Sequence, residues 1–515
     1  MPRYKAYDYD QLMMVPVSLE DQLMPGTLEY AIHHLIEERV DTSMFDEKYC
    51  NDETGRSAYD PKVLLKIVLL SYARGILHSR PMERACKENV TFMALACGQR
   101  PDHSTLAAFV SAMSEEQIVR LFTQVLLVCE EEGLLGGTHF SLDGLKLPSN
   151  ASKEWSGTHV ELRKKKEKLE QKVKEAVLEH RSEDRCGGDP DQERREKRLR
   201  RLKRQAERIE KFLGQNEPKR GRRGKEIQSN ITDNESAKMV SSHGVVQGYN
   251  ANALVDEKHQ VVVHAEAFGE GDDAGNVGPM LKGAKRNLQA AACGQEPLKG
   301  KIISADTGYY SVDNLEACRD QEVDAYIPDR EFRKRDPRFV QAKRHRRSVD
   351  RRKQRYESKK RWFTPEDFRL DERTGKLICP AGHGLYVRNR NFEVRGHRAI
   401  AYQAPKSACR GCSLRSKCLR MPKTESRQVH IFYGRRPGSL TDEMKRKIDT
   451  AEGRATYAKR LGIVEPVFGN LRAQKRIDRF TLRGRRKINL QWMLYCLVHN
   501  IEKIVNFGAS YAVTT

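Results

Sequence analysis

The chain has 515 residues, enough for two to four domains and a sizeable core, and 38% of the residues are hydrophobic. It carries 94 Lys and Arg against 71 Asp and Glu, a net charge of +23, and the basic residues are clustered. This clustering favours a polyanionic partner, above all nucleic acid, over a charged surface that serves only solubility.

The first ten residues are polar and rich in tyrosine, unlike a signal peptide. No apolar run reaches the roughly 20 residues that a membrane helix needs. We therefore expect a cytosolic protein that does not enter membranes and whose 12 cysteines are reduced. Clustered cysteines in such a protein bind metal more readily than they form disulfides.

Residues 1–135 are predicted to be helical. Asp60 and Pro61 are a typical helix cap and first helical residue, and an apolar run from Val63 to Leu70 follows. Short helices are also predicted over residues 81–87, 90–96, 106–113 and 115–132. This pattern fits a helix-turn-helix that binds DNA and, equally, a plain helical bundle. A glycine cluster at residues 133–137 marks the boundary of this region.

Two predicted strands end on an acidic residue. One covers residues 301–305 and stops at Asp306, and the other begins at residue 138 and stops at Asp143. A carboxylate at the C-terminal end of a parallel strand points into the crevice where α/β sheets bind ligands. Taken singly, each Asp is better explained as a turn or helix-cap residue.

The order of the predicted elements brings these acids together. From residue 138, and without residues 153–225, the order is strand, strand (248–256), strand (260–265), helix (276–292), strand (301–305), helix (312–321) and strand (324–328). This is the order of the ribonuclease-H-like fold, an α/β fold with a mixed sheet whose first and fourth strands are adjacent. Asp143 and Asp306 would then lie side by side, an arrangement that a divalent cation such as Mg²⁺ stabilises.

Residues 153–225 are predicted to form a basic helical hairpin with a coiled-coil-like seam and a turn at residues 186–190. The hairpin ends in Lys219, Arg220, Arg222 and Arg223, which are spaced by glycines. A charge run is usually a solvated face, but this spacing favours contact with phosphates.

A second insertion is predicted over residues 330–440. Its first part, residues 330–361, is extremely basic and is either a DNA contact or a disordered loop. Cys379, Cys409, Cys412 and Cys418 follow, a set that suits tetrahedral Zn²⁺, with His383 as a rival to Cys379. We expect a closed structural site that staples a small, zinc-ribbon-like β module.

The C-terminal region supplies a third acid. Residues 450–479 are rich in helix, and Glu465 and Arg472 lie on one face because they are seven residues apart. Beside the sheet, Glu465 would complete a metal cage with the two Asp residues, although taken alone it is a typical surface residue. Residues 488–507 form an almost wholly apolar helix that would close the core over one face of the sheet.

Together these motifs resemble those of the DDE transposases of bacterial insertion sequences. Residues 141–152 resemble their first-acid motif, residues 305–309 their second, and residues 457–472 their Tyr-x2-Arg-x3-Glu-x6-Lys/Arg signature. Residues 55–110 resemble the InsH-type N-terminal domain, and residues 379–418 resemble the cysteine-bearing insertion of one branch. Four residues separate Arg460 from Glu465 in place of three, which bears on the roles of Tyr457 and Arg460.

The resemblance implies cleavage of DNA at the ends of a mobile element, followed by attack of the freed 3′-hydroxyl on target DNA. It makes Asp143, Asp306 and Glu465 the catalytic ligands of two Mg²⁺ ions, which Mn²⁺ can replace. It also makes Tyr457, Arg460 and Arg472 contacts to DNA. A homodimer acting on paired ends in the bacterial cytoplasm, at the nucleoid, is expected.

Two other classes of function remain open. One is a ribonuclease-H-like nuclease or resolvase without strand transfer, and the other is a non-catalytic DNA-binding regulator derived from a transposase. A structural zinc protein built around the hairpin would leave the two strand-ending acids unexplained. Asp233, Asp272 and Asp273 could also approach the site, but each is interpreted first as a turn or cap residue.

Overall fold

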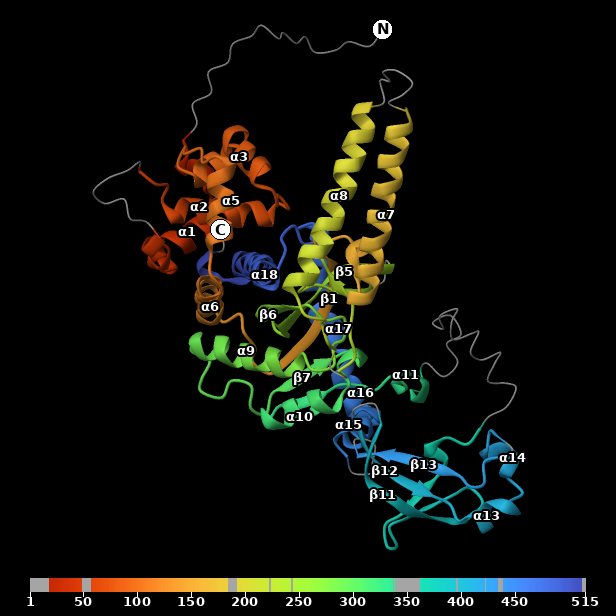
Figure 1. Ribbon diagram of the computed structural model, residues 1–515. Helices are drawn as coiled ribbons and strands as arrows, with labels where there is room; N and C mark the ends of the chain where they lie inside the picture. Colours follow the sequence, from red (N-terminus) through yellow and green to blue (C-terminus); the bar gives the residue numbers. More distant parts are fainter. Residues whose placement is uncertain are drawn as a thin grey trace, which may run out of the picture.

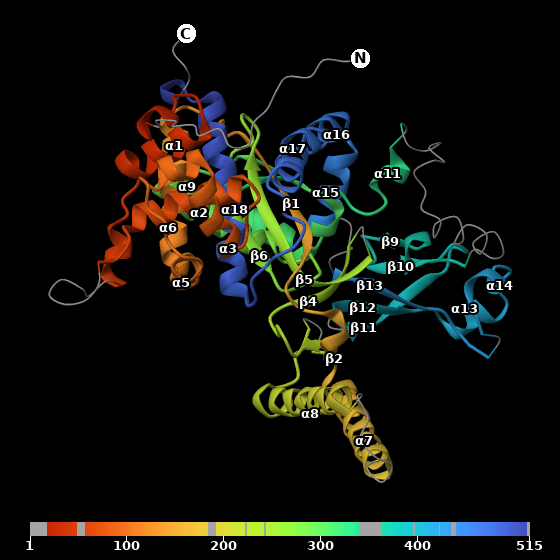
Figure 2. The same cartoon turned by 90° about the horizontal axis from the view of Figure 1, so that it is seen from above.

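The computed structural model describes residues 18–48, 57–183, 192–221, 224–241, 244–336, 338, 362–394, 397–421, 423–433 and 439–511. A mixed sheet flanked by helices forms the centre of the molecule (Figure 1). Three parts surround it in both views: the N-terminal helices, the long hairpin of α7 and α8, and a separate β module (Figure 2). The predicted α/β class is confirmed.

The N-terminal region consists of short helices, as predicted. They are α1 (Leu28–His34), α2 (Pro61–Ala73), α3 (Ser79–Glu88), α4 (Val90–Leu95), α5 (His103–Ala112) and α6 (Glu115–Glu131). The carboxylate of Asp60 accepts a hydrogen bond from the Lys62 amide at 2.7 Å, and Pro61 occupies the first turn. Local capping therefore sets the start of α2, and burial of its apolar residues holds it in place.

The central sheet has the strand order β4-β5-β1-β7-β8, and β6 also pairs with β5. The strands are β1 (His139–Pro148), β4 (Ala237–Ser241), β5 (Gly244–Asp256), β6 (Val262–Phe268), β7 (Ile302–Ala305) and β8 (Asp324–Tyr326). β5 runs antiparallel to β1, β4 and β6, whereas β1, β7 and β8 are parallel. The predicted adjacency of the two acid-bearing strands is confirmed, because Leu142 of β1 lies opposite Ala305 of β7.

β5 is the longest strand of the sheet and has different partners along its length. Residues 244–248 pair with β4, and residues 250–255 pair with β6. The whole stretch from Gly248 to Asp256 also pairs with β1 on the other side. β4 was not among the predicted strands.

Helices from distant parts of the chain cover the sheet. They are α9 (Val277–Ala290), α10 (Val312–Asp320), α15 (Leu440–Asp449), α16 (Ala451–Ala458), α17 (Arg460–Ala473) and α18 (Arg485–Phe507). Asn500 attaches α18 to β6. Its side-chain oxygen accepts a hydrogen bond from the Val262 amide at 2.8 Å, and its Nδ2 donates to the Val262 carbonyl at 2.8 Å. The buried apolar residues of α18, the sheet and the N-terminal helices form one continuous core.

The predicted hairpin insertion is present and is pinned at its base. α7 (His159–Glu183) and α8 (Gln192–Gln215) pack against each other, and the predicted turn at 186–190 lies outside the described residues. Two short strands, β2 (Ser156–Gly157) and β3 (Ser229–Asn230), pair at the base. Ser156 also donates a hydrogen bond at 2.9 Å to Gln247 of β5. A small core of Leu162, Ile209, Phe212 and Ile231 completes the attachment.

The second insertion contains a five-stranded sheet of order β13-β12-β11-β10-β9. Its elements are β9 (Arg369–Asp371), β10 (Lys376–Ile378), β11 (Gly384–Val394), β12 (His397–Gln403), α13 (Lys406–Arg410), α14 (Arg415–Cys418) and β13 (Gln428–Phe432). Its core is separate from the main one and includes Leu377, Leu385 and Ile400. Most of the basic stretch predicted over 330–361 lies outside the described residues, although Phe332–Arg335 forms α11.

None of the described helices combines the length and the apolar character that crossing a membrane requires.

One buried histidine should lower the stability of this core in acid. His499 of α18 is buried, its Nε2 lies 3.0 Å from the Gln260 carbonyl oxygen, and burial lowers its pKa to about 3. The unfolded chain, with an ordinary His pKa of about 6.5, binds more protons between these values. The free energy of unfolding should therefore fall by up to about 1.4 kcal/mol per pH unit as the pH drops through this window.

We predict that His499→Gln, whose amide can still donate to the Gln260 carbonyl, flattens this dependence in urea unfolding between pH 4 and 7. Exposed His78→Gln is the control and should keep the wild-type slope. An unchanged slope in His499→Gln would show that other groups cause the loss of stability in acid.

Candidate active site

Asp143 and Asp306 emerge on the same face of neighbouring parallel strands. Two residues before them, the hydroxyl oxygens of Ser141 and Ser304 lie 2.6 Å apart. Because side chains alternate along a strand, Asp143 and Asp306 follow on that same face. β7 ends just before Asp306, but β1 continues to Pro148, paired only with β5, so the prediction that this strand stops at Asp143 was wrong.

A buried arginine contacts the first acid. Arg460, at the start of α17, is 8% exposed, and its Nη1 donates to Asp143 Oδ2 at 2.8 Å. Burial raises the pKa of the Asp143 carboxyl, the guanidinium lowers it, and Asp306 raises it again, leaving the pKa above its ordinary value. The site therefore brings together two carboxylates whose mutual repulsion is offset only in part by the positive charge of Arg460.

Two glycines allow polar groups to crowd around these acids. A Cβ on Gly144, the residue after Asp143, would lie 2.6 Å from Asn252 Nδ2 and 2.7 Å from Asn250 Oδ1. A Cβ on Gly308 would lie 2.9 Å from Asp306 Oδ1, which also accepts a 2.8 Å hydrogen bond from the Gly308 amide. A side chain at either position would displace the groups that surround the carboxylates.

Glu465 occupies a different face of α17 from Arg460. The buried face of this helix consists of Arg460, Ile463, Val464, Val467, Phe468 and Leu471. Glu465 and Arg472 are both exposed, consistent with the predicted shared face. Glu465 lies about 7.5 Å along the helix axis from Arg460. Pro466, which follows it, cannot donate the helical hydrogen bond to the carbonyl of Gly462.

The structure thus brings together Asp143, Asp306 and Arg460, but it does not gather Glu465 into a compact ligand set with the two Asp residues. Among the residues that the structure describes, no three His, Cys, Asp or Glu side chains are arranged to hold a metal ion.

The other predicted DNA contacts have different surroundings. Tyr457 is half-buried, and its ring lies edge-on to Phe332 at 5.4 Å. Lys219 is also half-buried, and its Nζ donates to the carbonyls of Asn234 and Ser236 at 3.1 and 3.2 Å, so it holds the base of the hairpin. Arg220 is exposed and donates to the Gly224 carbonyl at 3.1 Å. Arg222 and Arg223 lie outside the described residues.

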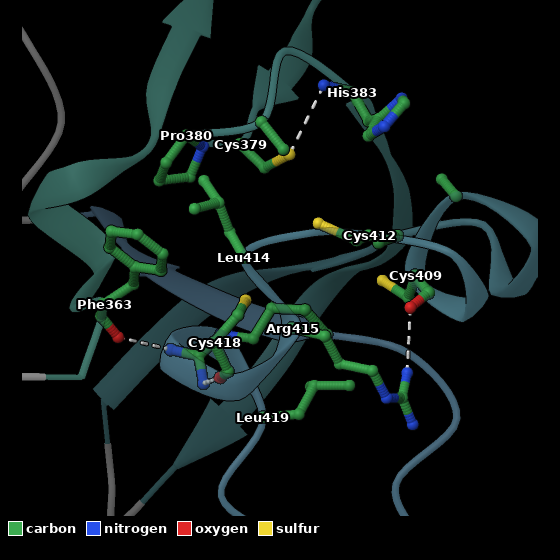
Figure 3. A pocket seen from close by; sticks show the side chains of 14 residues that line it. Phe363, Cys379, Pro380, His383, Cys409, Cys412, Leu414, Arg415, Cys418 and Leu419 are labelled. Carbon is green, nitrogen blue, oxygen red and sulfur yellow. Dashed lines mark hydrogen bonds between the residues drawn. The ribbon is translucent and has the colours of Figure 1, made fainter.

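The four predicted zinc ligands line one cavity in the β module. In Figure 3 the sulfur atoms of Cys379, Cys409, Cys412 and Cys418 face a common space, while the ring of His383 points away from it. The Cys379 sulfur accepts a hydrogen bond from the His383 amide at 3.3 Å. Burial raises the pKa of the Cys418 thiol, and the other three cysteines add to this effect against Arg427.

Three of the acids interpreted as turn or cap residues can now be distinguished. Asp233 accepts a 2.9 Å hydrogen bond from the Tyr249 hydroxyl, and Asp272 caps the Ala274 amide at 3.1 Å, so both have structural roles. Asp273 instead faces Asp306 across Gly308. The only signal in the sequence was its position in the loop after a strand, which does not show where that loop folds.

Comparison with known families places these observations in context. Residues 378–505 match the family described as a transposase DDE domain, and residues 17–112 match the transposase domain DUF772. The first match contains Glu465 and Arg472 but not the strands that carry Asp143 and Asp306. No curated protein matches the chain at a significant level.

Both matched regions are parts of transposases, and they occur in the order that the motifs predicted. Together the two matches are those expected of an insertion-sequence DDE transposase. The chain is a DNA transposase, an enzyme that binds DNA and acts on its phosphodiester bonds.

Proposed function

We propose that this transposase cleaves the ends of its element and joins them to target DNA with Asp143, Asp306 and Glu465 as the catalytic acids. The observation that carries the proposal is the parallel pairing of β1 with β7, which sets Asp143 and Asp306 side by side beside α17. The strand order, with β6 and β5 on one side of β1 and β7 and β8 on the other, supports a ribonuclease-H-like core.

The oxygen donors at this site have the chemistry that a hard divalent cation requires, although no three of the described acidic side chains are gathered around one point. Asp143 and Asp306 offer carboxylate oxygens, the ligand type that Mg²⁺ prefers, and Asn250 adds a buried amide oxygen with no hydrogen-bond partner among the described residues. Mg²⁺ bound there would activate the attacking hydroxyl and stabilise the leaving oxygen. Glu465, on the exposed face of α17, would approach this site from the DNA side.

Arg460 would position the phosphodiester. Its guanidinium donates a hydrogen bond to Asp143, and its Cζ lies 5.9 Å from the centre of the Tyr457 ring. Its Nε has no hydrogen-bond partner among the described residues. A guanidinium beside the acids can donate two parallel hydrogen bonds to a phosphate. Tyr457 would fix the plane of this arginine, and Arg472 would bind the backbone farther along α17.

α8 offers the most basic surface for DNA. Of its 24 residues, ten are Lys or Arg and four are Glu, whereas α7 carries eight basic and six acidic residues. A groove between α8 and Trp155 is lined by Lys197, Arg200, Arg201, Arg204, Gln205 and Arg208. This row of cations would follow a phosphate backbone and extend the predicted contact at Arg220. A homodimer would bring two such hairpins to the paired ends.

The four cysteines would hold a structural Zn²⁺. They come from the β10–β11 turn and from the α13 and α14 region, so a shared ion would tie these parts of a small core together. Four sulfurs around one cavity, with no disulfide among the described cysteines, support this assignment.

For catalysis, we predict that Glu465→Gln lowers metal-dependent cleavage of a duplex carrying the element's end on the order of a thousandfold, while DNA affinity stays within about twofold. Exposed Glu443→Gln on α15 is the matched control and should retain activity. Strand joining to a target plasmid separates a transposase from a nuclease. Binding by the wild type without cleavage in Mg²⁺ or Mn²⁺ would instead favour a regulator.

For DNA binding, we predict that Arg201→Ala with Arg204→Ala weakens duplex binding and lowers the slope of log affinity against log salt by about 1.8, because two phosphate contacts are lost. Fluorescence anisotropy from 50 to 300 mM salt measures the slope. Lys172→Ala with Lys174→Ala removes the same charge from exposed positions of α7 and should leave the slope unchanged. Equal effects in both pairs would rule out a specific role for α8.

For the cysteine site, we predict about one zinc per chain by elemental analysis, falling below about 0.1 in Cys409→Ser with Cys412→Ser, together with a lower melting temperature. Cys97→Ser changes an exposed cysteine far from this cavity and should keep the metal. Zinc-free wild-type protein with an unchanged melting temperature would contradict the assignment.

A further inference from the structure

A third carboxylate reaches the two strand-ending acids from the loop between β6 and α9. Asp273 Oδ2 lies 2.7 Å from the point where a Cβ of Gly308 would stand, and Asp306 Oδ1 lies 2.9 Å from the same point. The two carboxylate oxygens are therefore less than about 6 Å apart. No lysine or arginine in the described part of the chain forms an ion pair with Asp273; Lys146 acts on its carboxylate only at longer range, and Asp306 opposes that effect.

The loop that carries Asp273 is fixed in this position. The backbone carbonyl of Asp273 accepts hydrogen bonds from the Gly275 and Asn276 amides at 2.9 and 3.2 Å. The side chain of Asn314, which is fully buried, donates to the Asp273 carbonyl at 3.1 Å and to the Tyr309 carbonyl at 2.8 Å. One amide thus ties the Asp273 loop to the turn that follows Asp306.

Asn250 links this carboxylate to the Asp143 side of the site. Its Nδ2 donates to Asp273 Oδ1, which leaves Oδ2 directed toward Asp306. Asn250 is 1% exposed, and its Oδ1 has no hydrogen-bond partner among the described residues. That oxygen lies against Gly144, next to Asp143. A buried acceptor without a donor requires an explanation, and a metal-bound water would supply the missing donor.

The three acids surround one buried phenol. The hydroxyl of Tyr309 donates to Asn252 Oδ1 at 2.9 Å. Burial raises the pKa of Tyr309 well above its usual range, and Asp273, Asp143 and Asp306 raise it further. Tyr309 thus stays a neutral donor at the floor of the acidic site.

We propose that Asp273 is a ligand of the same divalent cation as Asp143 and Asp306, with Asn250 oriented to bind a water of that cation. This inference rests on the proposed function, since it adds a carboxylate to the site proposed there. The described residues do not form a ready-made set of three ligands, so the ion would draw the carboxylates from β1, the β7 turn and the β6–α9 loop together on the protein side as it binds. Glu465 approaches from the exposed side together with DNA.

The test is Mn²⁺ binding to the full-length, zinc-loaded protein without DNA, measured by the electron paramagnetic resonance signal of free Mn²⁺. Asp273→Asn should weaken binding at least about tenfold, because it removes one charged oxygen ligand while the shape and the acceptor for Asn250 are kept. Asp272→Asn makes the same change at the neighbouring, exposed residue and should stay within about twofold of the wild type.

Each outcome decides between the two claims. If Asp273→Asn binds Mn²⁺ as Asp272→Asn does, while Asp143→Asn and Asp306→Asn bind it weakly, this inference is overturned and the proposed site stands. If none of the four variants changes the affinity, the proposed metal site falls as well. Should Asp273→Asn fail to fold, Asp273→Ser serves instead. It also removes the carboxylate of Asp273, leaves Asp306 and Gly308 unchanged, and should weaken Mn²⁺ binding to a similar extent.

Discussion

Parallel pairing of β1 with β7 is the constraint on which the chemistry of this transposase depends. The hydroxyls of Ser141 and Ser304 meet across the two strands, and two residues later the same alternation delivers Asp143 and Asp306 to one face. The strand pairing keeps the two carboxylates near each other, so that Asp306 raises the pKa of Asp143. Arg460, brought in by α17, compensates part of the repulsion between them, and the proposed cation would compensate the rest.

Much of this arrangement could be predicted because its signals are local. An apolar run that stops at an acid identifies β7, and Asp60-Pro61 identifies the start of α2. Charged heptad-like runs predict a helical hairpin within residues 153–225, where α7 and α8 lie. The adjacency of β1 and β7 was predicted because the order of the predicted elements is that of the ribonuclease-H-like fold, whose first and fourth strands are adjacent.

What could not be predicted depends on where side chains meet across long separations. Asp273 and Asp272 are indistinguishable in sequence, and only the fold of their loop decides that one faces Asp306 while the other caps a turn. Lys219 appears in sequence as one more cation of a basic run, yet two backbone carbonyls take up its ammonium. The continuation of β1 to Pro148 depends on the length of β5, a strand about a hundred residues away.

The pairing of β2 with β3 clamps the base of the α7–α8 hairpin to the body of the protein, and this clamp has a mechanical consequence. Each helix of the hairpin is about 36 Å long, and the described residues join it to the body near its base, so it can act as a lever arm. A rotation of about 10° at the clamp would displace its far end by about 6 Å. The clamp is bonded through Ser156 to Gln247, three residues before Asn250 in β5. A pull exerted by DNA on the end of the hairpin would thus be transmitted as torque to the strand that borders the acids.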